Sequence, residues 1–214
     1  MKGANEIAYN YIKSRILDGT YLPAQRLLEA QLSQEIGVSR NTIKKALLML
    51  QQDKLVFLEG NKGATIFSLS IEEVLEYYEV REALEMIIAS HAAEQIGGSE
   101  ILELKKLVEK MTRNMKELQF EEYSKGNREF HKIIYDVSKK PVAVNMIVGI
   151  RSQLNRFMIR TMLVPGRAEE SIQEHRDILQ ALEQHDSKTA QEKMGLHVRH
   201  VAETIKKHHG LLFH

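Results

Sequence analysis

The chain has no cysteine and no tryptophan, and only three of its 214 residues are proline. Without cysteine there is no disulfide framework, thiolate metal ligand or thiol nucleophile, and a reducing compartment fits this composition. No apolar run approaches the roughly 18 residues of a membrane span, and the first ten residues lack the apolar segment of a signal peptide. We therefore expect a cytoplasmic globular protein with no membrane partner.

A strong charge of either sign is also missing, because 30 Lys and Arg residues nearly balance 29 Asp and Glu residues. The charges are unevenly distributed, however. Residues 1–70 hold nine basic and six acidic residues, a net charge of +3, and the remainder sums to −2. All nine histidines lie from His91 onward. This asymmetry indicates two modules with different chemistry, and we expect one domain over residues 1–69 and a second over residues 70–214.

The spacing of apolar residues in the first module predicts three short helices and a hairpin. Gly37 ends the second helix, and Ser39 has the residue type of an N-cap for the third. Turn residues 59–63 separate two β-prone segments. The expected helices cover about 7–18, 28–36 and 39–52, and the expected strands cover 56–58 and 64–67. This order is that of a winged helix-turn-helix with a two-stranded wing.

The second module reads almost entirely as long helices. Gly97-Gly98, Pro141, Pro165-Gly166 and Asp186 mark the breaks between them. The expected helices cover about 70–96, 99–118, 120–138, 142–163, 168–184 and 187–208. The sequence therefore predicts a mainly α protein whose second domain is an antiparallel all-helical bundle.

The third helix of the first module has an apolar stripe and an unusual polar face. Arg40 lies in its first turn, and Asn41, Lys44 and Lys45 lie away from the stripe. Arg, Asn and Lys are side chains that contact base edges and phosphates when a helix enters the major groove. An ordinary solvated face would look similar on a lone helix. The preceding helix, the tight turn and the basic wing favour DNA binding.

The run LLEAQLSQEIGVSRNTIKKALLMLQQDKLV, followed by NKGATI, resembles the winged-helix domain of the GntR family of bacterial transcriptional regulators. The resemblance covers about residues 5–67 and implies a DNA-binding function. It implies that the recognition helix contacts the operator and that the wing approaches the minor groove. Together with Lys45, which stands where the family commonly has an acidic residue, the DNA-contacting set is Ser39, Arg40, Asn41, Thr42, Lys44, Lys45, Asn61, Lys62 and Gly63.

Histidines on three expected helices of the second module are candidates for a metal site. Asn127 and His131 are four residues apart and share one helix face, whereas His175 and His197 lie on two later helices. Facing helices of a bundle can bring such side chains together, and imidazole suits zinc, nickel or copper. Spacing alone does not choose these three, because the other six histidines are equally available and solitary histidines are commonly surface residues.

Residues 71–208 are similar to the ligand-binding domain of the FadR-like subgroup of GntR regulators, an all-helical domain of the FCD type. The similarity lies in YEVREALE, in Phe130-His131 and in EHRDILQAL, with Asp186, Ala190 and His197 following His175 at offsets of 11, 15 and 22. It implies a divalent metal, zinc or nickel, held by Asn127, His131, His175 and His197. Because Asn127 replaces the subgroup's Asp, we expect weaker metal binding; a metal-free polar pocket is the alternative.

Arg81 matches an arginine on the first helix of the same domain, which implies that it binds the carboxylate of a small organic-acid effector. An intrahelical salt bridge to Glu85 is the alternative. We thus expect a homodimeric, effector-responsive regulator, a repressor of a double-stranded DNA operator, and not an enzyme. Two other classes remain open: a metal-dependent hydrolase that uses the histidine cluster, and a DNA-binding protein without an effector.

Overall fold

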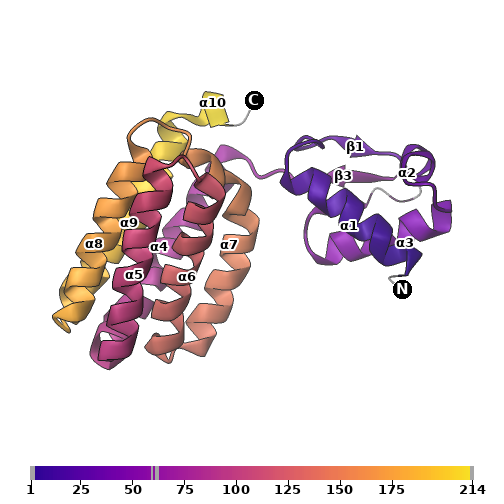
Figure 1. Cartoon of the computed structure of the whole chain (residues 1–214). Coiled ribbons are helices and arrows are strands. Elements are labelled where there is room, and N and C mark those ends of the chain that lie inside the picture. Colours follow the sequence, from indigo (N-terminus) through magenta and orange to yellow (C-terminus); the bar gives the residue numbers. More distant parts are fainter. Residues whose placement is uncertain (1–2, 59, 61–62, 213–214) are drawn as a thin grey trace. The chain divides into compact units, whose positions relative to one another are not determined.

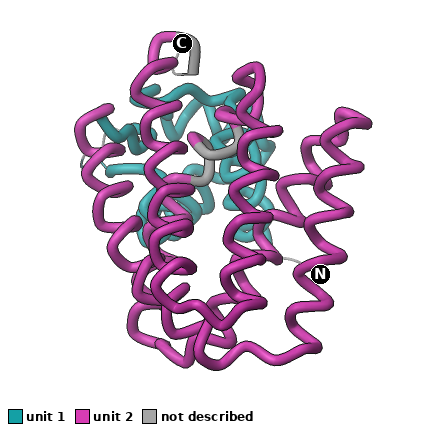
Figure 2. Tube along the Cα trace, turned by 90° about the vertical axis from the view of Figure 1, so that its left-hand side faces the viewer, with its two compact units in different colours: residues 1–70 teal, residues 71–214 magenta. Residues whose placement is uncertain are grey.

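A computed structural model describes residues 3–58, 60 and 63–212 of the chain. The chain divides into two compact units, residues 1–70 and 71–214, shown in different colours in Figure 2. Each unit buries its own cluster of apolar side chains. Among the described residues, no helix combines the length and apolar character that crossing a membrane requires.

The first unit contains three helices and a small antiparallel sheet (Figure 1). Its elements are α1 (Ala4–Leu17), β1 (Arg26–Leu27), α2 (Glu29–Ile36), α3 (Arg40–Gln52), β2 (Val56–Leu58) and β3 (Ala64–Ile66). The sheet has the order β1-β3-β2, and both pairs are antiparallel. Ile12 of α1 and Ile43 and Leu47 of α3 are fully buried in the core of this unit.

Strand β1 is the main difference from the expected fold, because the sequence predicted only a two-stranded wing. Two residues are too few to show the alternation by which strands are recognised. The strand is positioned instead by backbone hydrogen bonds on its N-terminal side. Ala24 donates to the carbonyl of Ile66 at 3.2 Å, and Ile66 donates to the carbonyl of Gln25 at 2.9 Å.

The turn between α2 and α3 is fixed by one glycine and one hydroxyl. Gly37 has a φ of +73°, a left-handed conformation that glycine adopts without the steric cost of a side chain. Ser33 Oγ donates to the carbonyl of Val38 at 2.6 Å. The turn sets the direction in which α3 leaves α2, as the helix-turn-helix interpretation requires.

The second unit is a bundle of long helices. Its elements are α4 (Ile71–Gln95), α5 (Gly98–Lys116), α6 (Phe120–Ser138), α7 (Pro141–Thr161), α8 (Arg167–Glu183), α9 (Ser187–Lys207) and the short α10 (His209–Leu212). Helix α4 packs against α6, α7, α8 and α9, and α5 packs against α6 and α8 (Figure 1). The mainly α fold class is confirmed, and the long helices end within a few residues of their expected bounds.

Candidate functional site

The exposed face of α3 presents the expected DNA-contacting side chains. Ser39 caps the helix, since its Oγ accepts a hydrogen bond from the Thr42 amide at 3.1 Å. Arg40, Asn41, Lys44 and Lys45 are exposed. The stripe on the opposite side, made of Ile43, Ala46, Leu47 and Leu50, is 0% exposed. Burial of the stripe therefore anchors the helix, and the basic face stays accessible to a partner.

The wing is only partly described. Asn61 and Lys62, two of the predicted contacts, lie outside the described residues. Gly63 is buried with a φ of +100°, and a Cβ on it would lie 2.2 Å from the Leu27 carbonyl oxygen. Gly63 therefore serves the close approach of β3 to β1, a structural requirement that is independent of any DNA contact.

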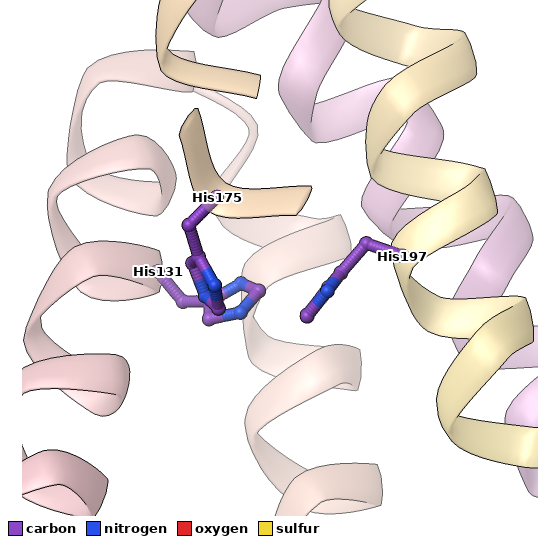
Figure 3. Close-up of side chains that lie close together, drawn as sticks. All are labelled: His131, His175 and His197. Carbon is purple, nitrogen blue, oxygen red and sulfur yellow. The ribbon is translucent and has the colours of Figure 1, made fainter. Parts of the chain in front are cut away.

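His131 of α6, His175 of α8 and His197 of α9 converge inside the second unit (Figure 3). Each offers one ring nitrogen, and these nitrogens all lie within 4.8 Å of one another. The three residues are at most 3% exposed. Zinc binds imidazole nitrogen at about 2.0–2.1 Å, so small rotations of the rings bring all three nitrogens to one ion.

Two of the three imidazoles have their tautomer fixed by an acceptor outside the cluster. His175 Nδ1 donates to the backbone carbonyl of Ser171 at 2.5 Å. His197 Nδ1 donates to the Glu174 carboxylate at 2.7 Å. In each ring the bare nitrogen is therefore Nε2, and that of His175 is buried without a hydrogen-bond partner. Metal-binding histidines commonly have such a partner on the second nitrogen.

The third imidazole faces a buried carboxylate. His131 Nδ1 lies 3.5 Å from Glu85 Oε2, and both residues are almost fully buried. The other oxygen of Glu85 accepts hydrogen bonds from Arg81 at 3.1 Å and from Tyr135 at 2.7 Å. Arg151 completes this set at 3.3 Å. Burial opposes ionisation of Glu85, but the guanidinium groups of Arg81 and Arg151 hold its pKa well below its usual range.

Burial keeps the cluster neutral. Transfer from water into the bundle lowers the pKa of His131 and of His175 to about 3 and that of His197 to about 4. Burial raises the pKa of Glu174, but the hydrogen bonds from His197 and Arg167 outweigh it and lower that pKa to about 2. Neutral imidazoles with bare nitrogens are the form that binds a divalent cation.

Asn127 lies one turn before His131, beside a cavity of about 50 Å³. Its Oδ1 is buried and has no hydrogen-bond partner, a situation that usually costs stability. His197 and Arg81 line the same cavity. The three imidazole nitrogens fit a divalent ion. The orphaned oxygen of Asn127 shares a cavity with His197, and its role as a fourth, weak ligand stays a prediction.

Arg81 forms the salt bridge to Glu85 that was the alternative interpretation of the sequence, and its contact with an effector stays a prediction. Its Nε donates to Glu85 one turn along α4, and the pair is buried. The same side chain lines the cavity beside Asn127. The salt bridge therefore orients the guanidinium at the cavity wall.

Sequence reasoning missed the groups that support the histidines. Glu174 directly precedes His175, and its oxygens accept hydrogen bonds from His197, from His200 at 2.8 Å and from Arg167 at 2.8 Å. Glu85 was considered only as a partner of Arg81. A signal was available for Glu85, since it follows Arg81 by four residues, but nothing in the spacing connects it to His131.

Comparisons with known proteins agree with the two units. Residues 5–66 match the model of the family described as bacterial regulatory proteins, gntR family, and residues 76–200 match that of the FCD domain. The chain is 27% identical over 199 residues to the HTH-type transcriptional regulator YdhC of Bacillus subtilis, covering 92% of this chain and 89% of that protein. It is 20% identical to the HTH-type transcriptional repressor RspR of Escherichia coli, covering 95% and 89% respectively.

A solved structure of E. coli McbR/YncC has the same fold, with a TM-score of 0.70 and 21% identity over 100% of this chain and 98% of that chain. The matching families and these relatives are transcriptional regulators and not enzymes.

Proposed function

Because the chain belongs to the GntR family of bacterial transcriptional regulators and carries an FCD domain, we propose that it is a repressor whose operator affinity is set by a small carboxylate bound beside a divalent metal. The convergence of three buried, neutral imidazoles carries the metal and effector part of this proposal. The exposed basic face of a capped recognition helix carries the DNA part. The name of RspR, a repressor, supports the sign of the regulation.

The DNA-contacting residues are proposed from their chemistry and exposure. Arg40 and Asn41 in the first turn are placed to contact base edges, and Lys44 and Lys45 supply charge for phosphates. A homodimer is part of the proposal, since two symmetric recognition helices can contact half-sites about one DNA turn apart. Such a protein acts in the cytoplasm, where the operator lies.

Arg40→Ala tests the DNA-binding part. Loss of a base contact costs about 1–3 kcal/mol of binding free energy and relaxes base preference. Affinity should also fall with salt, with a slope of about −0.9 per neutralised phosphate. The matched control is Arg113→Ala, which removes one exposed positive charge from α5 in the other unit. Equal operator affinity of the two variants in a gel-shift titration would contradict the assignment of α3.

His175→Ala tests the metal-binding part. The variant removes one ligand whose Nε2 is buried without a partner, so metal content should fall and thermal stability in excess zinc should drop. His91→Ala, on the surface of α4, is the control and should retain metal. Elemental analysis of the dialysed proteins measures this directly. Metal contents near zero in both the wild type and the control would contradict the metal site and favour a pocket that binds the effector without metal.

The regulatory part requires that the acid prefer one state of the protein over another. Couplings of this kind are typically about 1–3 kcal/mol, or about 5- to 150-fold in DNA affinity. Small carboxylic acids are first screened for thermal stabilisation of the protein. An acid that stabilises it should weaken operator affinity by about 5- to 150-fold. An acid that stabilises the protein without any effect on operator affinity would contradict the regulatory claim.

A further inference from the structure

Another arginine that lines the cavity, Arg167, has so far been described only as a hydrogen-bond donor to Glu174. Arg167 is the first residue of α8 and is 4% exposed. Its Nη2 donates to Glu174 at 2.8 Å, but its Nε and Nη1 are buried without a hydrogen-bond partner. Nη1 lies 4.0 Å from the carboxylate of Glu170, which is largely exposed. Buried guanidinium donors without an acceptor are costly, and a ligand that supplies the acceptor removes this cost.

One other donor beside Arg167 also lacks an acceptor. Tyr123 lines the cavity, and its hydroxyl is buried without a hydrogen-bond partner. Thr161 and Ser171 add hydroxyl groups to the wall, and Asn127 lies on it together with His197. Among the described residues that line the cavity, none is Asp or Glu. On the Arg167 side of the cavity, the groups without a hydrogen-bond partner are therefore donors. The proposed metal lies on the other side, beside Asn127 and His197.

The charges of the surrounding groups set the charge of the ligand. Four arginines, Arg81, Arg128, Arg151 and Arg167, are opposed by the carboxylates of Glu85, Glu170 and Glu174, which leaves one net positive charge. A divalent ion at the histidines raises this to three. An aspartate at position 127 would cancel one of these charges, but Asn127 does not. A ligand with a single negative charge would leave more positive charge uncompensated than a ligand with two.

We propose, building on the proposed function, that Arg167 binds a second carboxylate of the effector and that the effector is therefore a short dicarboxylate. One carboxylate lies beside Asn127 and the histidines, and the other accepts hydrogen bonds from Arg167 and Tyr123. The two free donors of this guanidinium, Nε and Nη1, can each donate a charge-assisted hydrogen bond to a carboxylate oxygen. Arg167 thus determines specificity for a doubly charged acid over a singly charged one.

The size of the cavity limits the length of the acid. A water molecule needs about 10–15 Å³ of such volume, so a cavity of about 50 Å³ holds roughly four waters. Acids of three or four carbons are the longest that fit with modest rearrangement of the wall. Met162, one of the lining residues, has a flexible side chain that can make such an adjustment.

Two pairs of probes separate charge from size. Malonate and malonamate have the same shape, as do succinate and succinamate, but each amide has one negative charge fewer. Calorimetric titration of the zinc-loaded full-length protein should give about tenfold or more tighter binding of each dicarboxylate, since hydrogen bonds to a charged acceptor are the strong ones. Metal content is measured after each titration to exclude chelation by the acid. Equal affinities within each pair would overturn the proposal.

Variants locate the effect on Arg167. Arg167→Gln should lose the preference for the dicarboxylate and keep its metal, and Arg167→Lys should restore part of the preference. Arg176→Gln, which removes an exposed arginine of the same helix, is the control and should behave as the wild type. Asn127→Asp adds a negative charge to the cavity. It should therefore reduce the ratio of the affinity for each dicarboxylate to the affinity for its amide. An undiminished preference in Arg167→Gln overturns the proposal, and if that variant does not fold, the wild-type comparison still decides.

Failure of this proposal can be told apart from failure of the proposed function. A wild type that binds operator and zinc but none of the four acids contradicts the dicarboxylate alone. Loss of operator binding or of zinc binding by the wild type contradicts the proposed function itself.

Discussion

Acidification of the metal-free protein should unfold the helical unit well before its carboxylates are protonated. His131 and His175 have folded-state pKa values of about 3, and His197 has one of about 4, against 6.5 for an ordinary histidine. Between these values the unfolded chain binds protons that the folded chain does not. The free energy of unfolding therefore falls as pH drops below 6.5, and it is unaffected by these groups above that pH.

The magnitude follows from the size of the window. Within the pH range between its folded-state and unfolded-state pKa values, each histidine lowers the free energy of unfolding by at most about 1.4 kcal/mol per pH unit. The three together therefore cost at most about 4 kcal/mol at one unit below 6.5, a large fraction of the about 5–15 kcal/mol that holds a typical protein folded. Glu85 and Glu174 have lowered pKa values, so their contribution is lost in the same direction but only below about pH 4.5.

The assay is urea unfolding of EDTA-treated protein, followed by circular dichroism at pH 7.5, 6.5, 5.5 and 5.0. His91→Gln, a change on the surface of α4, should keep the full loss of stability, whereas His175→Asn should reduce its steepness. A free energy of unfolding that stays constant from pH 7.5 to 5.5 would refute the conclusion that the three imidazoles are held neutral by burial.

The remaining expectations concern single residues. Asn127→Asp should raise zinc affinity by about 10- to 100-fold in a competition titration with a chelator dye, and no change would mean that this side chain does not reach the ion. Gly63→Ala should destabilise the first unit by about 1–3 kcal/mol, since it forces a φ of +100° and a contact with the Leu27 carbonyl; unchanged thermal unfolding would contradict the close approach. Tyr135→Phe should cost about 1–3 kcal/mol in urea unfolding, because Glu85 loses a buried hydrogen bond, and a neutral effect would show that this hydrogen bond does not stabilise the fold.

The sequence predicted the helices well because their signals are local. Ile43 and Leu47 repeat at helical spacing, and Ser39 caps the same helix, so α3 is specified within a few turns. Strand β1 was missed because its hydrogen bonds lie between residues about 40 positions apart, such as Gln25 and Ile66. Local signals specify helices here, but the pairing of a two-residue strand depends on the tertiary fold.

The candidate site was predictable only in part, and mainly through family resemblance. Spacing placed Asn127 and His131 on one face, but nothing local selects His175 and His197 from the other histidines. The supporting groups were out of reach for a different reason. Glu174 precedes a predicted ligand, yet its role depends on contacts with α9 that only packing creates. Arg167 could not be recognised either, because unsatisfied donors exist only relative to a folded cavity.

Glu174 accepts hydrogen bonds from His197 on the metal side and from Arg167 on the side of the orphaned donors. A ligand that moves His197 or Arg167 also changes the position of the Glu174 carboxylate. The hydrogen bond that this carboxylate forms with the other residue then changes as well. By thermodynamic reciprocity, the acid would bind more tightly to the zinc-loaded protein by the same factor by which zinc binds more tightly in the presence of the acid. If the chain functions as proposed, the concentration of acid needed to weaken operator binding would then depend on the concentration of zinc.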